Sequence, residues 1–168
     1  LKKAGFSGEV AIVYPTRKTP KFPDQGAVVI ADSTLASRPA LQQQILQWAP
    51  DGAIYDEAHR GKTFNSARSR AVSRIMHQVS GLKIPITGTP IISKPVDLIP
   101  LLSQSGHLDP IFGGASAFVN RYCTWNRFRG WTANKTQLER LREDLDRFVW
   151  VHRLKDDVLD LPPIRKVF

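Results

Sequence analysis

Four short apolar runs constrain the fold of this 168-residue chain more than any other feature. They cover residues 10–14, 27–31, 52–55 and 84–87. The first two are β-branched and nearly uninterrupted, which is typical of strands buried on both faces in a parallel sheet covered by helices. Helical patterns lie between the later runs, over residues 37–48 and 66–79. This alternation of strand and helix predicts an α/β fold with a mostly parallel sheet.

The pattern after Gly88 is helical. Short helices are predicted over residues 97–102 and 116–122, and a longer helix follows the capping-box sequence at residues 136–139. Between them, aromatic residues interleave with Arg127 and Arg129. Such a composition suits stacking on bases or docking on a partner, but we favour an inserted subdomain with its own small core. The aromatic residues are Trp125, Phe128 and Trp131.

The charge balance favours a polyanionic partner. The chain has 24 Lys and Arg against 15 Asp and Glu, a net charge of +9, and residues 60–74 hold five basic residues and no acid. A basic domain without a nucleic-acid partner remains an alternative. No apolar run approaches the roughly 20 residues that a membrane-spanning helix needs, so no membrane partner is expected. The single cysteine, Cys123, favours a reducing, intracellular location.

The run at residues 52–55 ends in Asp56, Glu57, Ala58 and His59. Two adjacent carboxylates at the carboxyl end of a buried strand lie where α/β sheets bind their ligands. One carboxylate can hold Mg²⁺ through water, while its neighbour orients or deprotonates the water that attacks a γ-phosphate. His59 would then couple the nucleotide site to neighbouring elements. The alternative is a charged surface loop.

A second polar segment follows the run at residues 84–87 and reads Thr87, Gly88, Thr89 and Pro90. Alone it is an ordinary turn at the end of a strand. Thr87 lies 31 residues after Asp56, which is enough for one helix and a return to the neighbouring strand. We therefore expect its two hydroxyl groups beside the carboxylates.

These segments, taken in order, resemble a known family. Asp-Glu-Ala-His-Arg at residues 56–60, a basic helix and Thr-Gly-Thr-Pro-Ile at residues 87–91 resemble motifs II and III of superfamily-two helicases. Residues 148–163 look like the segment that ends lobe one in Swi/Snf-related ATPases. Residues 121–123 and 130–134 are similar to the branch with annealing helicases and bacterial and phage relatives. Residues 31–35 would match motif Ib.

The resemblance implies a RecA-like, P-loop NTPase-type first lobe, incomplete at its N-terminus. Residues 1–107 would form the partial lobe with motifs Ib, II and III, residues 108–163 a helical extension, and residues 164–168 the start of the linker to a second RecA-like lobe. The complete protein would use ATP and Mg²⁺ to step along double-stranded DNA.

The resemblance also assigns site residues. Glu57 would position the attacking water, Asp56 would hold Mg²⁺ through water, and His59 would join them at the nucleotide. Thr87, Gly88, Thr89 and Pro90 would couple nucleotide state to DNA grip, and Arg153, Lys155 and Asp157 would belong to the motif before the second lobe. DNA-backbone contacts are expected from the loop at residues 32–34 and the basic helix, although a solvated basic face is an alternative for that helix. The residues concerned are Asp32, Ser33, Thr34, Arg68, Arg70 and Arg74.

The chain departs from the family pattern in one large respect. The phosphate-binding motif I is absent, since the earlier glycine that Gly61-Lys62-Thr63 would require falls at Asp56. We expect motif I before Leu1 and the second lobe after Phe168, and no ATP hydrolysis by this chain alone. Smaller departures are Ile92-Ser93 in place of Gln-Asn and His152 in place of the first tail arginine.

Two alternative functions and several properties stay open at this point. A non-catalytic DNA- or protein-binding module that retains the helicase fold is the main alternative, and an RNA-directed helicase is disfavoured by the tail motif. The biological process and the oligomeric state do not follow from the sequence.

Overall fold

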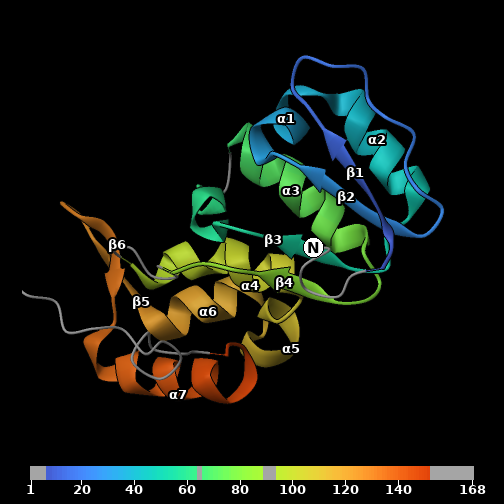
Figure 1. Ribbon diagram of the computed structural model, residues 1–168. Helices are drawn as coiled ribbons and strands as arrows, with labels where there is room; N and C mark the ends of the chain where they lie inside the picture. Colours follow the sequence, from blue (N-terminus) through green and yellow to red (C-terminus); the bar gives the residue numbers. More distant parts are fainter. Residues whose placement is uncertain (1–6, 64–65, 89–93, 152–168) are drawn as a thin grey trace, which may run out of the picture.

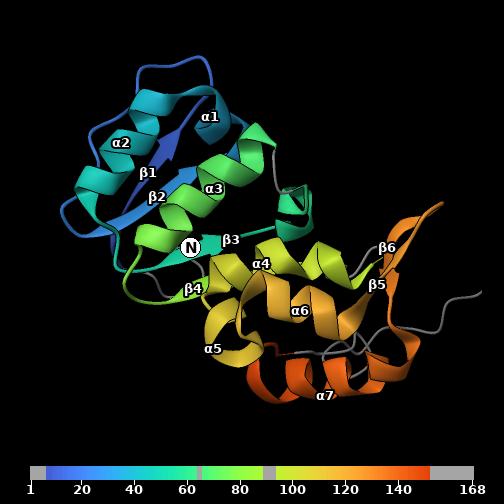
Figure 2. The ribbon, with the colours of Figure 1, turned by 180° about the vertical axis from the view of Figure 1, so that it is seen from behind.

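The computed structural model describes residues 7–63, 66–88 and 94–151 (Figure 1). One part of the molecule holds strands and helices of the first ninety residues, another holds the later helices, and two short strands lie between the parts (Figures 1 and 2). The first part contains β1 (Glu9–Val13), β2 (Gly26–Ile30), α1 (Asp32–Ser37), α2 (Pro39–Trp48) and α3 (Ala67–Gln78). The strands between the parts are β3 (Ala53–Tyr55) and β4 (Lys83–Pro85), and a 3₁₀ turn, η2 (Ala58–Gly61), follows β3.

The second part is helical apart from one hairpin. Its helices are η3 (Pro95–Leu98), α4 (Ile99–Ser105), α5 (Leu108–Phe112), α6 (Gly114–Tyr122), η4 (Lys135–Gln137) and α7 (Leu138–Phe148). The hairpin strands are β5 (Cys123–Asn126) and β6 (Gly130–Ala133). Among the described residues, no helix is both apolar and long enough to cross a membrane.

The parallel pairing expected from the sequence is confirmed. Strand β1 pairs in parallel with β2, and β3 pairs in parallel with β4. The expectation of one larger sheet is not met by the described residues, where each pair forms its own two-stranded sheet. Strands β3 and β4 are only three residues long.

The prediction that the strands are buried on both faces is wrong. Side chains on one face stay open to solvent among the described residues: Ile12 is 48% exposed, Val29 46% and Ile54 69%. Val13, by contrast, belongs to the core that also includes apolar residues of α1, α2 and α3. An apolar run therefore predicted the strands correctly but not the number of faces that are covered.

The two central helices are confirmed at the predicted places. Pro39 starts α2 in its first turn, where an N–H would have no partner within the helix. The hydroxyl of Ser66 caps α3 by accepting a hydrogen bond from the N–H of Ser69 at 3.1 Å. The loop expected at residues 32–34 is instead the first turn of α1. Asp32 in that turn suits the positive end of the helix, and the next turn buries Leu35.

The later helices differ from the prediction at their ends. The segment expected over residues 97–102 runs longer, as η3 followed by α4, and α5 was not predicted. Helix α6 is confirmed within two residues. The capping box before α7 is wrong, because the Thr136 hydroxyl donates to Oδ1 of Asn134 at 2.8 Å and residues 135–137 form a 3₁₀ turn. The predicted apolar stripe of α7 is narrower than expected, with Leu141 and Leu145 buried.

The aromatic segment forms a hairpin rather than a subdomain. Strands β5 and β6 are antiparallel and project from the helical part (Figures 1 and 2). Trp125 is 62% exposed and Phe128 is 92% exposed. The favoured interpretation, a subdomain with its own small core, is therefore wrong. The aromatic core beneath the hairpin is built from Phe112, Phe118 and Tyr122.

Candidate functional site at the ends of β3 and β4

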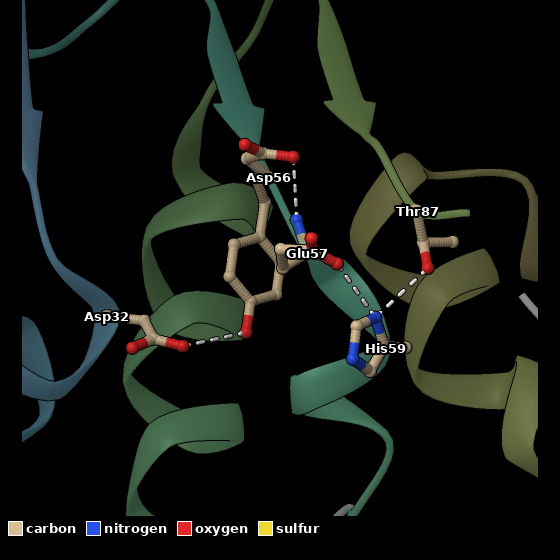
Figure 3. Close-up of polar contacts among 6 residues, drawn as sticks. Asp32, Asp56, Glu57, His59 and Thr87 are labelled. Atoms are coloured by element: carbon tan, nitrogen blue, oxygen red, sulfur yellow. Dashed lines mark hydrogen bonds and ion pairs between the residues drawn. The ribbon is translucent and has the colours of Figure 1, made fainter. Parts of the chain in front are cut away.

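Backbone hydrogen bonds carry the pairing of β3 and β4 past the ends of both strands. The N–H of Ile86 donates to the carbonyl of Tyr55 at 2.8 Å, and the N–H of Ala58 donates to the carbonyl of Ile86 at 2.9 Å. The chain that leaves β3 therefore runs beside the chain that leaves β4. This pairing brings residues 56–59 next to Thr87, as Figure 3 shows.

Three of the predicted site residues meet in one polar network. Nδ1 of His59 lies 3.2 Å from Oγ1 of Thr87 and 3.2 Å from Oε2 of Glu57 (Figure 3). The imidazole is 30% exposed, whereas the Glu57 side chain is 60% exposed. One side of the Glu57 carboxylate thus contacts the histidine, and the rest of the carboxylate is open to solvent. Water can reach the carboxylate from that open side.

The backbone at Glu57 separates the two adjacent carboxylates. Its φ of 50° and ψ of 42° lie in the left-handed region, which residues other than glycine adopt infrequently. The Glu57 N–H donates to Oδ1 of Asp56 at 2.8 Å, which supports this turn. As a result, Glu57 points toward His59, whereas Asp56 points away from it (Figure 3). Backbone conformations of this kind cluster at functional sites, where the surrounding structure maintains them.

Tyr55, directly before the two acids, joins the site to α1 and α3. Its hydroxyl donates to Oδ2 of Asp32 at 3.4 Å, and Nε of Arg68 lies 3.1 Å from the same oxygen. Burial, together with the charge of Asp32 and this hydrogen bond, raises the pKa of Tyr55 to about 12. The phenol therefore remains a hydrogen-bond donor throughout the neutral range. No pattern in the sequence predicted this link, which spans three separate segments.

This link also bears on residues expected to contact DNA. The side chain of Asp32 is only 12% exposed and that of Arg68 33%, so the two charges pair with each other within the fold. Ser33 is exposed, whereas Thr34 is 2% exposed and its side chain belongs to the interior. Of the three residues at 32–34 that were expected to contact DNA, only Ser33 is exposed.

Arg70 and Arg74 lie on the exposed side of α3. Both line a shallow pocket of about 250 Å³ between α3 and α4. Nε2 of His77 lies 3.0 Å from Oγ of Ser103 across the same pocket and connects the two helices. The pocket's other lining residues are Ser73 and Pro100. This contact links α3, which carries the basic face, to α4.

Most residues of the predicted coupling segment and of the predicted tail motif lie outside the described part of the chain. Gly88 is described and exposed, and within the described part of the chain no atom beyond its neighbours in sequence lies within 4 Å of a Cβ placed on it. The other predicted residues of this group lie outside the described residues: Thr89, Pro90, Arg153, Lys155 and Asp157.

The donor set at the end of β3 fits a magnesium–nucleotide complex better than a metal held by protein alone. Mg²⁺ usually keeps several waters and binds one or two carboxylates together with substrate phosphates. Asp56 offers an exposed carboxylate, one oxygen of which already accepts the Glu57 N–H. Among the described residues, no group of three or more His, Cys, Asp or Glu could hold an ion alone. A metal here would depend on the phosphates of a bound nucleotide.

Comparison with known proteins identifies the family of the chain. No curated protein matches the chain. The family model of the SNF2-related domain matches residues 13–167, which include both acids, the Thr87 segment and the hairpin. With nearly its whole length matched, the chain belongs to the SNF2-related domain family, whose members are helicase-like ATPases that act on DNA.

Proposed function

We propose that the complete protein is an ATP-dependent translocase on double-stranded DNA and that this chain is its first RecA-like lobe. The observation that carries the proposal is the contact of His59 with both Glu57 and Thr87. It joins the acid of one strand end to the hydroxyl of the next. The alternative, a charged surface loop, does not explain why one histidine contacts side chains of two segments 30 residues apart.

Glu57 is the residue proposed to act on water. Its carboxylate is open to solvent on one side and contacts His59 on the other. A group that orients water and accepts its proton needs both a fixed position and access to water. When bound, Mg²⁺ and ATP would supply a phosphoryl group with its charge partly neutralised. Asp56 would hold the ion through water, on the side that faces away from His59. The separated carboxylates thus suit two different tasks.

Thr87 is proposed to carry the coupling to DNA. Because its hydroxyl contacts His59, a shift of Glu57 during hydrolysis would alter the position of the segment that begins with Thr87 and Gly88. Thr89 and Pro90 would continue this coupling segment. Contacts with DNA phosphates are proposed for Ser33, Arg70 and Arg74, with a second RecA-like lobe closing over the duplex. This proposal also includes two predictions made from the sequence: the chain is related to the branch that contains the annealing helicases, and the protein is intracellular.

The second candidate is a non-catalytic DNA- or protein-binding module that retains the helicase fold. The two candidates differ in a direct way, because a complete protein of the second kind would release no phosphate from ATP under any condition.

The test is Glu57→Gln in the complete protein. Gln keeps the size of the side chain but cannot accept a proton, so DNA-stimulated phosphate release should fall by about 10²- to 10⁴-fold. Binding of a fluorescent ATP analogue should stay within a few-fold of wild type. Glu139→Gln, at an exposed acid in the first turn of α7, is the matched control and should leave turnover unchanged. Near-normal turnover of Glu57→Gln would show that the role of Glu57 is misassigned.

A further inference from the structure

The β5–β6 hairpin has a well-defined tip. Residues 127–129 form the loop, and Oδ1 of Asn126 accepts hydrogen bonds from the N–H groups of Phe128 at 2.9 Å and Arg129 at 3.1 Å. Gly130, the first residue after the loop, has a φ of +67°, a left-handed conformation that glycine adopts without steric cost. The tip is therefore already ordered before any partner binds. A partner would bind it at a small cost in conformational entropy.

The hairpin presents three aromatic rings outside the core. Trp125 and Trp131 are directly opposite each other on the two strands, with ring centres 5.1 Å apart and planes at 70°. Trp125 is 62% exposed, Trp131 37%, and Phe128 at the tip 92%. Phe112, Phe118 and Tyr122 beneath the hairpin are exposed by at most 2% and already form a closed cluster. The exposed rings are therefore not needed to complete the core, and Phe128 and Trp125 keep most of their ring surface open to a ligand.

The hairpin segment itself carries charge of one sign. Residues 110–138 contain no acid, and Arg127 and Arg129 at the tip are exposed and form no ion pair within the described part of the chain. Beside this loop, Nζ of Lys94 donates to the carbonyl of Arg129 at 3.0 Å and adds a further cation. The basic residues of the segment itself are Arg121, Arg127, Arg129 and Lys135. A ligand that matches this surface has flat apolar faces and negative charge at short intervals.

Unpaired nucleotides have both properties. In a duplex the faces of the bases are covered by their neighbours, whereas single-stranded bases can stack on aromatic side chains while the phosphates meet nearby cations. We propose that the β5–β6 hairpin binds single-stranded nucleic acid, with Phe128 and Trp125 stacking on bases and Arg127 and Arg129 near the phosphates. This activity lies beyond the proposed translocation on duplex DNA and does not depend on it.

The central experiment measures the affinity of this chain for a fluorescent 20-nucleotide oligo-dT strand and for the corresponding oligo-U strand. Phe128→Ala should weaken single-strand binding by roughly 5- to 150-fold, the effect typical of removing one base–aromatic stack. Because it removes no charge, it should leave the salt dependence unchanged. Trp125→Ala is the second variant and should act in the same direction. Leu82→Ala, at another exposed apolar residue (69% exposed), is the matched control and should bind like wild type.

A charge variant separates stacking from attraction to phosphates. Arg127→Ala combined with Arg129→Ala should make the plot of log affinity against log salt shallower by about 0.7 for each phosphate that the variant no longer neutralises. Weaker binding to DNA alone would identify DNA as the ligand. Equally weakened binding to DNA and RNA would identify the base and phosphate as the groups recognised.

Two outcomes would overturn the proposal. One is single-strand affinity of Phe128→Ala and Trp125→Ala that equals that of Leu82→Ala. The other is an equal weakening of blunt duplex binding, since the hairpin would then contact the backbone and not unpaired bases. Neither outcome touches the proposed translocase, whose test is the turnover of Glu57→Gln. Conversely, a Glu57→Gln protein with normal turnover would leave the single-strand result standing.

Discussion

The ends of β3 and β4 and the β5–β6 hairpin present their functional groups in opposite ways. At the strand ends, short polar side chains from segments about 30 residues apart are drawn into one network around His59. In the hairpin, large side chains from neighbouring residues extend into solvent around a three-residue loop. The first arrangement exists only when two distant strands have paired. The second is set by local turn chemistry, and so it can be altered without disturbing the first.

The two regions also rest on similar supports. A buried tyrosine anchors each one through a carboxylate: Tyr55 donates to Asp32, and Tyr122 donates to Oδ2 of Asp144 at 2.7 Å. Burial, followed by the hydrogen bond to Asp144, raises the pKa of the Tyr122 hydroxyl as well. In both regions the group that meets solvent is therefore different from the group that secures the fold. This division predicts which substitutions change stability and which change binding.

The largest effect should separate a supporting ring from a presented ring. Phe118→Ala removes a side chain with no exposed surface that packs against Phe112 and Tyr122 at ring distances of 5.3 and 5.1 Å. It should lower the free energy of unfolding by about 3–5 kcal/mol. Phe128→Ala, at the exposed tip, should stay within about 0.5 kcal/mol of wild type. Urea denaturation of the three proteins measures both values, and a similar destabilisation of both variants would place Phe128 in the core after all.

How far the sequence could predict the molecule depends on the range of the interactions. Apolar runs and helical periodicity located β1 to β4, α2 and α3, because each pattern reports which side of a local element is buried. Coverage of the sheet faces, by contrast, depends on elements far along the chain, and Ile54 proved exposed for that reason. The carboxylates and Thr87 could be expected together from strand order alone. The left-handed backbone of Glu57 and the link from Tyr55 to Asp32 could not, since no local pattern specifies them.

The hairpin shows the opposite failure. Its turn signals, Asn126 and Gly130, are local and readable, yet the aromatic residues were interpreted as core. Aromatic side chains are usually buried, so composition alone favours a core over a binding surface. The structure shows a complete aromatic cluster beneath them, formed by Phe112, Phe118 and Tyr122, so the core does not need these rings.

A smaller effect should separate duplex binding from single-strand binding. For the unchanged chain, the slope of log duplex affinity against log salt should be roughly −2 to −5. If Arg70 and Arg74 contact the DNA backbone, replacing both by Ala should make this slope shallower by one or two units. Single-strand binding through the hairpin should keep most of its affinity, because the basic face of α3 belongs to the other part of the molecule (Figure 1). Titration of a fluorescent duplex at several salt concentrations gives the slope.

The control for this variant removes the same charge from a different helix. Arg140 and Arg142 lie on the exposed side of α7, so their joint replacement by Ala lowers the net charge equally. A slope that changes alike in both double variants, or in neither, would favour a solvated basic face on α3. Tight binding to one duplex sequence that survives high salt would contradict the translocase proposal itself, since stepping along DNA cannot depend on base identity.

The smallest effect concerns the anchor of the strand ends. Tyr55→Phe removes the hydroxyl that donates to Asp32 and should lower the free energy of unfolding at pH 8 by about 0.5–1.5 kcal/mol. The pKa of Tyr55 is raised from 10.0 to about 12 in the folded protein, so the wild-type advantage should be full below pH 10. It should then shrink as pH rises from 10 to 12, because the unfolded chain releases the proton first. Urea denaturation of both proteins across this range measures the difference, with Tyr14→Phe, at a tyrosine that is 45% exposed, as the control. A Tyr55→Phe difference that is constant from pH 8 to pH 11.5 would mean that the hydroxyl does not hold Asp32. The anchor of the ends of β3 and β4 would then reduce to the ion pair between Asp32 and Arg68.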